Sequence, residues 1–222
     1  MEDVPYFISV EKAIEIVKQT SISLHIEDVN LDQCHGRILA VDLASRVDDP
    51  PFDNSSMDGF ACKHNSDATY PLTLTIQGIV AAAPEDEERI LDENKAYRIM
   101  TGAPLPKGAD SILQIEKCTI DEKHNTVTLL EAPKPHFVRK QGENLKKASV
   151  ALAKGTKLTP SRVGLCATMG YPEVPVFRPL RIAIVSTGDE LKQPGEELHR
   201  GEVYESNSYG LSGLVRWMGH VP

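Results

Sequence analysis

Residues 50–61 read PPFDNSSMDGFA, and the character of the chain changes at this stretch. Its two prolines interrupt regular structure, because proline lacks an amide hydrogen and fixes its own backbone angle. A helical pattern lies on the N-terminal side of the prolines, whereas short strand-like runs follow them. The stretch therefore predicts a domain boundary, after which a compact β-rich lobe begins.

The segment before the prolines predicts a helix and then an extended piece. Ser9 is a suitable N-cap, since its side chain can accept a hydrogen bond from an early helical N–H. Gly36 is expected to end a short turn, and RILAVDLAS (37–45) is expected to be extended. The apolar residues that follow Ser9 recur at helical spacing: Val10, Ala13, Ile14 and Val17.

After the prolines, short runs with a period of two predict strands between turns rich in glycine and proline. LTLTI (72–76) alternates apolar residues with threonine, as a half-buried strand does. YRIM (97–100), SILQIE (111–116) and TVTLL (126–130) are expected to be further strands. GTKLTPSRVGLCATMG (155–170) then returns to helical spacing, with a proline suited to the first turn and a glycine at the end.

The last part of the chain predicts the opening of a doubly wound α/β domain. RIAIVS (181–186) is apolar enough to be a strand buried on both faces, as in a parallel sheet. A helix capped by Asn207 or Ser208 follows, and HVP (220–222) begins another extended piece. The second parallel strand is barely begun, so we expect the domain to be truncated. The helix carries an apolar stripe of Leu211, Leu214, Val215 and Met218.

Composition fits a folded chain and argues against several classes of protein. The net charge of −8 over 222 residues disfavours nucleic acids and anionic membranes as partners. The four cysteines are far apart, which favours neither a zinc site nor a disulfide framework. No apolar run approaches the roughly 18 residues of a membrane span. The acidic N-terminus lacks the pattern of a signal peptide, so a cytoplasmic location is expected.

The opening stretch is the first of three candidate functional constellations. Turn chemistry explains Asp53, Asn54 and Gly59, because Asp and Asn form Asx-turns and glycine accepts unusual backbone angles. It does not explain Asp58, which lies between Met57 and the glycine. A carboxylate on a tight turn could hold Mg²⁺, orient a water or accept a hydrogen bond from a ligand. A structural and a functional interpretation both remain open here.

The second constellation, RIMTGAPLPKGAD (98–110), runs from a predicted strand into a turn with two prolines. It is not a Walker A loop, because no Lys-Ser or Lys-Thr follows its second glycine. A rigid strand-to-turn element and a ligand loop are equally compatible with it.

The third constellation, VSTGDELKQPG (185–195), follows the predicted buried strand, and here the functional interpretation is favoured. Open α/β sheets bind ligands at the carboxyl ends of their strands. Ser186, Thr187 and the N–H groups around Gly188 are suitable donors to an anionic group. The acidic pair that follows, Asp189 and Glu190, implies a divalent cation or a polarised water.

Together these stretches resemble the MoeA/gephyrin E-domain family of molybdopterin molybdenumtransferases. The resemblance covers almost the whole chain and implies an α+β / α/β multidomain protein. Domain I, elongated and dimer-forming, would comprise residues 1–46 and 140–177, with a β-rich domain II at 47–139. Residues 178–222 would be the truncated start of a molybdopterin-binding-type domain III. The resemblance rests on PPFDNSSMDGFA, RIMTGAPLPKGADSILQIE, VRKQGEN, AKGTKLTPSRVGLCATMG and VSTGDELKQPGEELHRGEVYESN.

The reaction that the resemblance implies is insertion of molybdate into adenylylated molybdopterin, with loss of AMP and help from Mg²⁺. By motif match, Asp58, Thr101 and Glu190 would be catalytic, and Asp58 and Glu190 would be associated with Mg²⁺ or molybdate. The lobe of one subunit would reach across a homodimer, so that Glu190 would come from the other subunit. The residues implied in cofactor binding are Asn54, Ser55, Ser56, Gly102, Ser186, Thr187, Gly188, Asp189 and Asn207.

Departures from the family pattern leave alternatives open. Glu205 and Asn144 stand where aspartate is common, and family members continue well beyond this length, so we expect this chain to be inactive alone. One alternative is a non-catalytic scaffold of the same family, and another is a stand-alone domain that shares only TGDEL and SN. Besides the homodimer, candidate partners are a molybdopterin adenylyltransferase and downstream molybdoenzymes, without nucleic acid or membrane.

Overall fold

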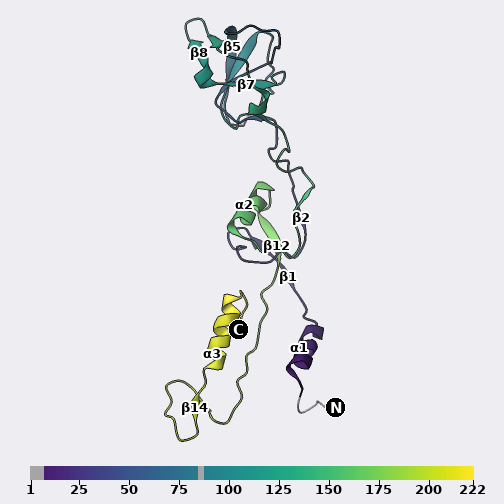
Figure 1. Ribbon diagram of the computed structural model, residues 1–222, viewed down its shortest axis with the longest axis vertical. Helices are drawn as coiled ribbons and strands as arrows, with labels where there is room; N and C mark the ends of the chain where they lie inside the picture. Colours follow the sequence, from purple (N-terminus) through teal and green to yellow (C-terminus); the bar gives the residue numbers. More distant parts are fainter. Residues whose placement is uncertain (1–7, 85–87) are drawn as a thin grey trace. The chain divides into compact units, whose positions relative to one another are not determined.

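The structure is a computed structural model that describes residues 8–84 and 88–222 (Figure 1). The argument against a signal peptide therefore rests largely on residues outside the described ones. The chain divides into two compact units, which we describe separately. Unit 1 comprises Met1–Val41, Lys154–Val163 and Pro172–Pro222, and unit 2 comprises Asp42–Ala153 and Gly164–Tyr171. The division into domains I, II and III stays a prediction.

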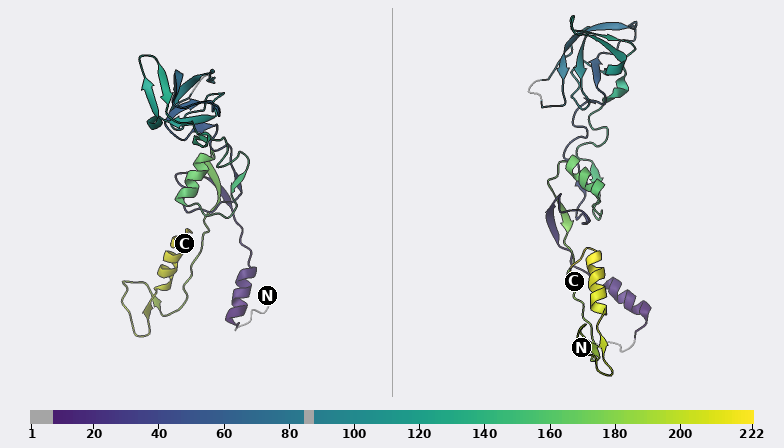
Figure 2. Two further views of the ribbon diagram at one scale, coloured as in Figure 1. Left: turned by 45° about the horizontal axis from the view of Figure 1, so that its top comes forward. Right: turned by 90° about the vertical axis from the view of Figure 1, so that its left-hand side faces the viewer.

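Unit 2 contains a six-stranded sheet, and we call the part that carries it, residues 54–139, the β lobe (Figures 1 and 2). Neighbouring strands are antiparallel except β5 and β6, which are parallel and shifted in register between Ile76 and Gly78. In spatial order the strands are β7 (Ser111–Gln114), β4 (Gly59–Cys62), β6 (Lys95–Ile99), β5 (Leu72–Val80), β9 (Thr126–Leu129) and β8 (Cys118–Asp121).

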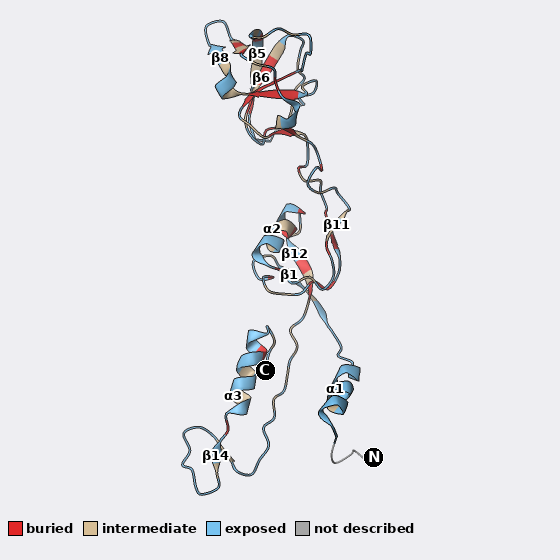
Figure 3. Ribbon diagram, in the orientation of Figure 1, coloured by how far each residue is buried: buried red, intermediate tan, exposed pale blue. Residues whose placement is uncertain are grey.

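Four of these strands confirm the predicted ones, and two were not predicted. The predicted strand at 111–116 ends early, because the 3₁₀ turn η1 (Ile115–Lys117) follows β7. Strand β4 was missed because all four of its residues are buried, which removes the alternation that marks a half-buried strand. Its side chains nevertheless alternate between two cores on opposite faces of the sheet, and the β lobe contains many buried residues (Figure 3). One core contains Phe60, Cys62, Leu74, Ala96, Leu113, Val127 and Leu129. The other contains Ala61, Val80, Tyr97, Ile99, Ala103, Ile112 and Val138.

Short elements surround the sheet. Strand β3 (Asn54–Ser55) pairs with β10 (Val138–Arg139), which follows the 3₁₀ turn η2 (Pro135–Phe137). Strand β2 (Leu43–Ala44) pairs with β11 (Val150–Leu152). These pairs join the two passages of chain that lead into and out of the β lobe.

Helix α2 (Pro160–Thr168) confirms the second predicted helix, and Gly170 after it has a φ of 84°, as a left-handed C-terminal stop requires. In unit 1, strands β1 (Ile26–Asn30) and β12 (Glu173–Phe177) form an antiparallel pair. Helix α1 (Val10–Gln19) begins as predicted, since the Ser9 side chain accepts from Lys12 N at 3.2 Å.

In the C-terminal part of the chain, the strand predicted at residues 181–186 is not formed. Residues 181–186 form no strand and are half-buried to exposed, because within the described residues they find a single lateral partner. That partner is Val221, whose N–H donates to Leu180 O at 2.9 Å and whose carbonyl accepts from Ile182 N at 2.8 Å. The bridge is parallel. Of the expected parallel pairing, this part of the chain therefore shows one bridge, between Arg181 and Val221. A second parallel contact joins β13 (Leu191–Lys192) to β14 (Val203–Tyr204).

Helix α3 (Asn207–Trp217) confirms the last predicted helix, but its predicted caps are wrong. Asn207 and Ser208 lie inside the helix, and the residue before them, Ser206, makes no side-chain cap. The Glu205 carboxylate takes this role by accepting from Ser208 N at 2.7 Å. Of the predicted stripe, Val215 alone is buried. The described chain is thus a mixed α+β protein, as predicted, and none of its described helices is long and apolar enough to cross a bilayer.

The glycine of the MDG step has a packing role that can be tested. A Cβ on Gly59 would lie 2.0 Å from Leu113 O, because β4 and β7 are in close contact there. Gly59→Ala should lower the free energy of unfolding by about 3 kcal/mol or more, measured by urea unfolding.

Gly164→Ala is the matched control, because this helical glycine has no neighbour within 4 Å of the added carbon. It should raise the stability by about 0.5–1 kcal/mol. Equal stability of the Gly59 variant and the unchanged protein would contradict the packing role.

Candidate functional site

Two of the predicted residues, Asp58 and Thr101, meet at one end of the sheet. Asp58 immediately precedes β4, and Thr101 follows β6. These strands are antiparallel neighbours with Gly59 opposite Ile99, so the start of one lies beside the end of the other. The Thr101 N–H and hydroxyl both donate to Asp58 Oδ1 at 2.7 Å. Residues 43 positions apart therefore form one hydrogen-bonded pair.

The pair leaves an ionised carboxylate at the surface. The Thr101 N–H bond, then the Thr101 hydroxyl and the nearby Arg98 charge, hold the pKa of Asp58 below its ordinary value. Asp58 and Thr101 are both exposed, so a ligand can reach them. A carboxylate with one oxygen fixed by two donors can offer its other oxygen to a cation or to a donor on a ligand.

Most other polar groups of the opening stretch hold the loop in place. The Ser55 hydroxyl donates to Met57 O, and the Ser56 hydroxyl donates to Phe137 O at 2.9 Å. Gly102 has a φ of 82°, and its N–H donates to Ser55 O at 2.8 Å. The predicted binding role of these three residues stays a prediction. Asn54 differs, because its buried Oδ1 accepts no hydrogen bond within the described residues.

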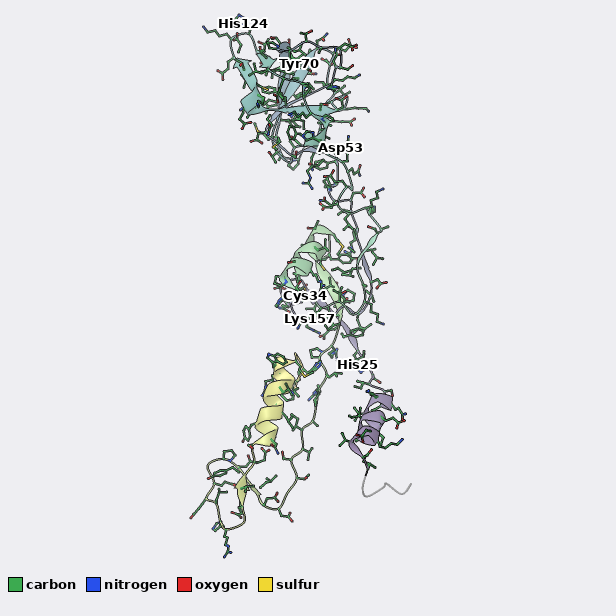
Figure 4. The ribbon with its side chains drawn as sticks, in the orientation of Figure 1. His25, Cys34, Asp53, Tyr70, His124 and Lys157 are labelled. Atoms are coloured by element: carbon green, nitrogen blue, oxygen red, sulfur yellow. The ribbon has the colours of Figure 1, made fainter. Side chains whose placement is uncertain are left out.

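Asp53 ties the two passages of chain together at the end of the β lobe where they enter it (Figure 4). Its carboxylate accepts from Lys140 Nζ and from Gln141 N, each at 2.8 Å. Partial burial raises its pKa, but these two partners outweigh burial and the net pKa is lowered. The VRKQGEN motif (138–144) makes a further tie, since Asn144 Nδ2 donates to Asp49 Oδ2 at 2.9 Å. Asp53 therefore has a structural role.

The remaining predicted residues lie in unit 1. The Ser186 hydroxyl donates to Glu205 Oε1 at 2.8 Å, and the same carboxylate caps α3. Glu205 is only 5% exposed, and the hydroxyl and N–H of Ser208 and the Ser186 hydroxyl hold its pKa below the ordinary value. It thus joins the end of the 181–186 segment to the start of the helix. Sequence reasoning noted Glu205 only as a departure from the family pattern.

The backbone at position 188 favours glycine. Its φ of 152° disfavours other residues, and a Cβ there would lie 2.7 Å from both Glu190 carboxylate oxygens. The Glu190 carboxylate thus lies against the backbone of Gly188. Thr187, Asp189 and Asn207 are exposed, and Asn207 is the first residue of α3.

The predicted residues thus form two groups. Asn54, Ser55, Ser56, Asp58, Thr101 and Gly102 lie together in unit 2. Ser186, Thr187, Gly188, Asp189, Glu190 and Asn207 belong to unit 1. The predicted assembly of both groups into one cleft stays a prediction. Across residues 8–84 and 88–222, no three His, Cys, Asp or Glu side chains gather as a metal site would require. Each group supplies one of the two predicted carboxylate ligands.

The acid dependence of stability tests the Asp58–Thr101 pair. Because the pKa of folded Asp58 is depressed, its stabilisation is present above the unfolded-state pKa and is lost as the pH falls through the folded-state pKa. Thr101→Val removes the hydroxyl donor, so the pKa of Asp58 should rise and the stability lost between pH about 6 and about 3 should shrink. Carboxyl NMR titration of Asp58 measures the first effect, and urea unfolding at both pH values measures the second.

Thr101→Ser keeps the hydroxyl and should behave like the unchanged protein. An Asp58 pKa that is the same in the valine and serine variants would show that the hydroxyl bond does not act on the carboxylate.

Several known proteins are similar to this chain. Residues 8–170 match the family described as MoeA N-terminal region (domain I and II). The chain is 39% identical over 203 residues to the molybdopterin molybdenumtransferase of Haemophilus influenzae, covering 90% of this chain and 49% of that protein. It is 36% identical over 201 residues to the molybdopterin molybdenumtransferase of a Nostoc species, covering 88% and 45%. The chain spans about half the length of these curated relatives.

Solved structures agree with these relatives. A crystal structure of a molybdopterin biosynthesis MoeA protein from Pyrococcus horikoshii OT3 is similar with a TM-score of 0.78 and 31% identity, over 89% of this chain and 53% of that chain. A second such structure from Pyrococcus gives a TM-score of 0.81 and 31% identity, over 96% and 55%. Since the family match covers well over half of the sequence, the chain belongs to the family of MoeA N-terminal regions (domains I and II).

Proposed function

We propose that this chain is the N-terminal part of a molybdopterin molybdenumtransferase, an enzyme of molybdenum cofactor biosynthesis. The complete protein would insert molybdate into adenylylated molybdopterin and release AMP. The observation that carries the proposal is the Asp58–Thr101 pair, which joins the two most specific motifs of the resemblance in one exposed site. The names of the relatives support it. A cytoplasmic location stays a prediction.

In this proposal the chain's own residues bind and orient the substrate. The Thr101 N–H and hydroxyl fix one oxygen of Asp58. The orientation of the carboxylate is therefore fixed, and its other oxygen is in place to contact the substrate or a cation. Asp58 and Glu190 offer the hard carboxylate oxygens that suit Mg²⁺, which would screen the negative charges of phosphate and molybdate groups. In the proposed homodimer, Asp58 would come from one subunit and Glu190 from the other.

We also propose that the protein is a homodimer, and the apolar face of α1 supports this. Val10, Ile14 and Val17 recur on one side of that helix, and they are 71%, 49% and 72% exposed. Water contact of such a face is unfavourable, and a second copy of the chain would cover it.

Val17→Glu should weaken dimerisation by at least about tenfold, because an unpaired carboxylate would be buried in the contact. Sedimentation over a range of protein concentrations measures the dimer fraction. Gln19→Glu makes the same charge change at a neighbouring polar position and should have little effect. A chain that is monomeric at every concentration would contradict the dimer.

Molybdate-dependent AMP release from adenylylated molybdopterin tests the reaction. The chain alone should release no AMP, whereas the chain joined to the C-terminal half of the Haemophilus relative should be active. In that longer protein Asp58→Asn should lower kcat by about 100-fold, since the carboxylate that orients the reacting groups is lost.

Asp121→Asn is the matched control, because Asp121 is an exposed residue at the end of β8 and pairs with His124. It should leave kcat unchanged. An Asp58 variant with full activity, or a longer protein that releases AMP without molybdate, would refute the proposed function.

A further inference from the structure

Arg98 lies beside the Asp58–Thr101 pair, on a strand whose other residues are mostly buried. It is directly opposite Phe60 of β4 and Ile79 of β5. Residues opposite one another on antiparallel strands point to the same face, so the aliphatic part of Arg98 shares its face with Phe60, which is fully buried. Arg98 as a whole is half-buried, and it lies three residues before Thr101.

The guanidinium of Arg98 has a donor without an acceptor. Its Nε is buried and makes no hydrogen bond to any residue in the described part of the chain. Its charge lowers the pKa of Asp58, yet the Oδ1 atom of Asp58 takes its hydrogen bonds from Thr101. Native proteins rarely leave a buried N–H unpaired, so the unpaired Nε favours a polar group that binds against this guanidinium.

Other basic residues of the β lobe show what an ordinary pairing looks like. Lys95, at the opposite end of β6, makes an ion pair with Asp92 at 2.7 Å. Arg89 donates to Ile79 O at 2.7 Å. Their nitrogen atoms are used within the fold, whereas the buried Nε of Arg98 is not.

A cation is also needed here on electrostatic grounds. An ionised Asp58 repels any anion that approaches Thr101, and Arg98 offsets that charge. Guanidinium groups bind tetrahedral oxyanions well, because their N–H groups match the spacing of two oxygens. Arg98, the Thr101 hydroxyl and Asp58 thus form a site with both signs of charge.

We propose that Arg98 is the oxyanion-binding residue of this site and holds a phosphate or molybdate oxygen of the substrate. The identity of that anion rests on the proposed function, whereas binding of an oxyanion by this chain does not. Sequence reasoning passed over Arg98 because it read YRIM (97–100) as a strand. The signal available was a charged residue between Tyr97 and Ile99, which are both buried in the strand.

Titration of this chain with inorganic phosphate and, separately, with molybdate tests the proposal. NMR would follow the Arg98 Nε–H and the Thr101 amide, with ionic strength held constant by chloride. Both signals should shift and reach saturation. Arg98→Gln should weaken anion binding at least about tenfold. The affinity of Arg98→Lys should lie between those of Arg98→Gln and the unchanged chain, since lysine keeps the charge but lacks the planar guanidinium.

Lys95→Gln is the matched control, because it removes one positive charge from the same strand and should change the affinity less than about twofold. Saturation with phosphate alone identifies a phosphate subsite, and saturation with molybdate alone identifies a molybdate subsite. Either result supports the proposal. Shifts that fail to saturate with both anions, or an Arg98→Gln variant that binds as the unchanged chain does, would overturn it.

Two results separate this inference from the proposed function. If Arg98-dependent binding is found but the longer protein needs no molybdate for AMP release, the function is wrong and the oxyanion site stands. If molybdate-dependent release is found and neither anion binds this chain, the function stands and the Arg98 site is wrong. Because the Nε–H signal is followed in the unchanged chain, a variant that fails to fold leaves the test intact.

Discussion

The pairing of β4 with β6 is the constraint on which the candidate site depends. It places the start of one motif beside the end of the other, so that Asp58 and Thr101 can bond directly. The pairing of β4 with its other neighbour, β7, leaves no room for a side chain at Gly59, whose Cβ would overlap Leu113 O. The glycine is therefore required by the sheet, and it fixes the carboxylate before it at the sheet's end. The pairing of β4 with its two neighbours thus determines both the packing of the lobe and the geometry of the site.

The fold was predictable where one physical signal dominated. Strand β5 and helices α1 and α2 were found from periodicity, a cap residue and the places of proline and glycine. Strand β4 was missed because burial on both faces removes alternation, although its residues carry the centre of the lobe. The prediction of a strand at residues 181–186 was wrong for a different reason. An apolar segment forms a strand only where a neighbouring segment can pair with it. Within the described residues, Val221 supplies a single bridge.

The sequence motifs predicted where the candidate site lies, but they did not predict which of its residues are structural and which are free to act on a ligand. The crowded opening stretch has most of its hydrogen-bonding groups bound within the fold: Asp53 holds Lys140 and Gln141, and Ser56 bonds to Phe137 O. Residue types cannot separate these structural carboxylates and hydroxyls from a functional one. The hydrogen bonds do, because they leave Asp58 exposed with a depressed pKa.

The same division of labour recurs in unit 1. Glu205 has a structural role, since its carboxylate accepts a hydrogen bond from Ser186 and caps α3 at Ser208. Glu190 is exposed, as is the neighbouring Asp189, and its carboxylate lies against the backbone of Gly188. Close packing requires the glycine beside Asp58, whereas Gly188, two residues before Glu190, is favoured by its backbone angle.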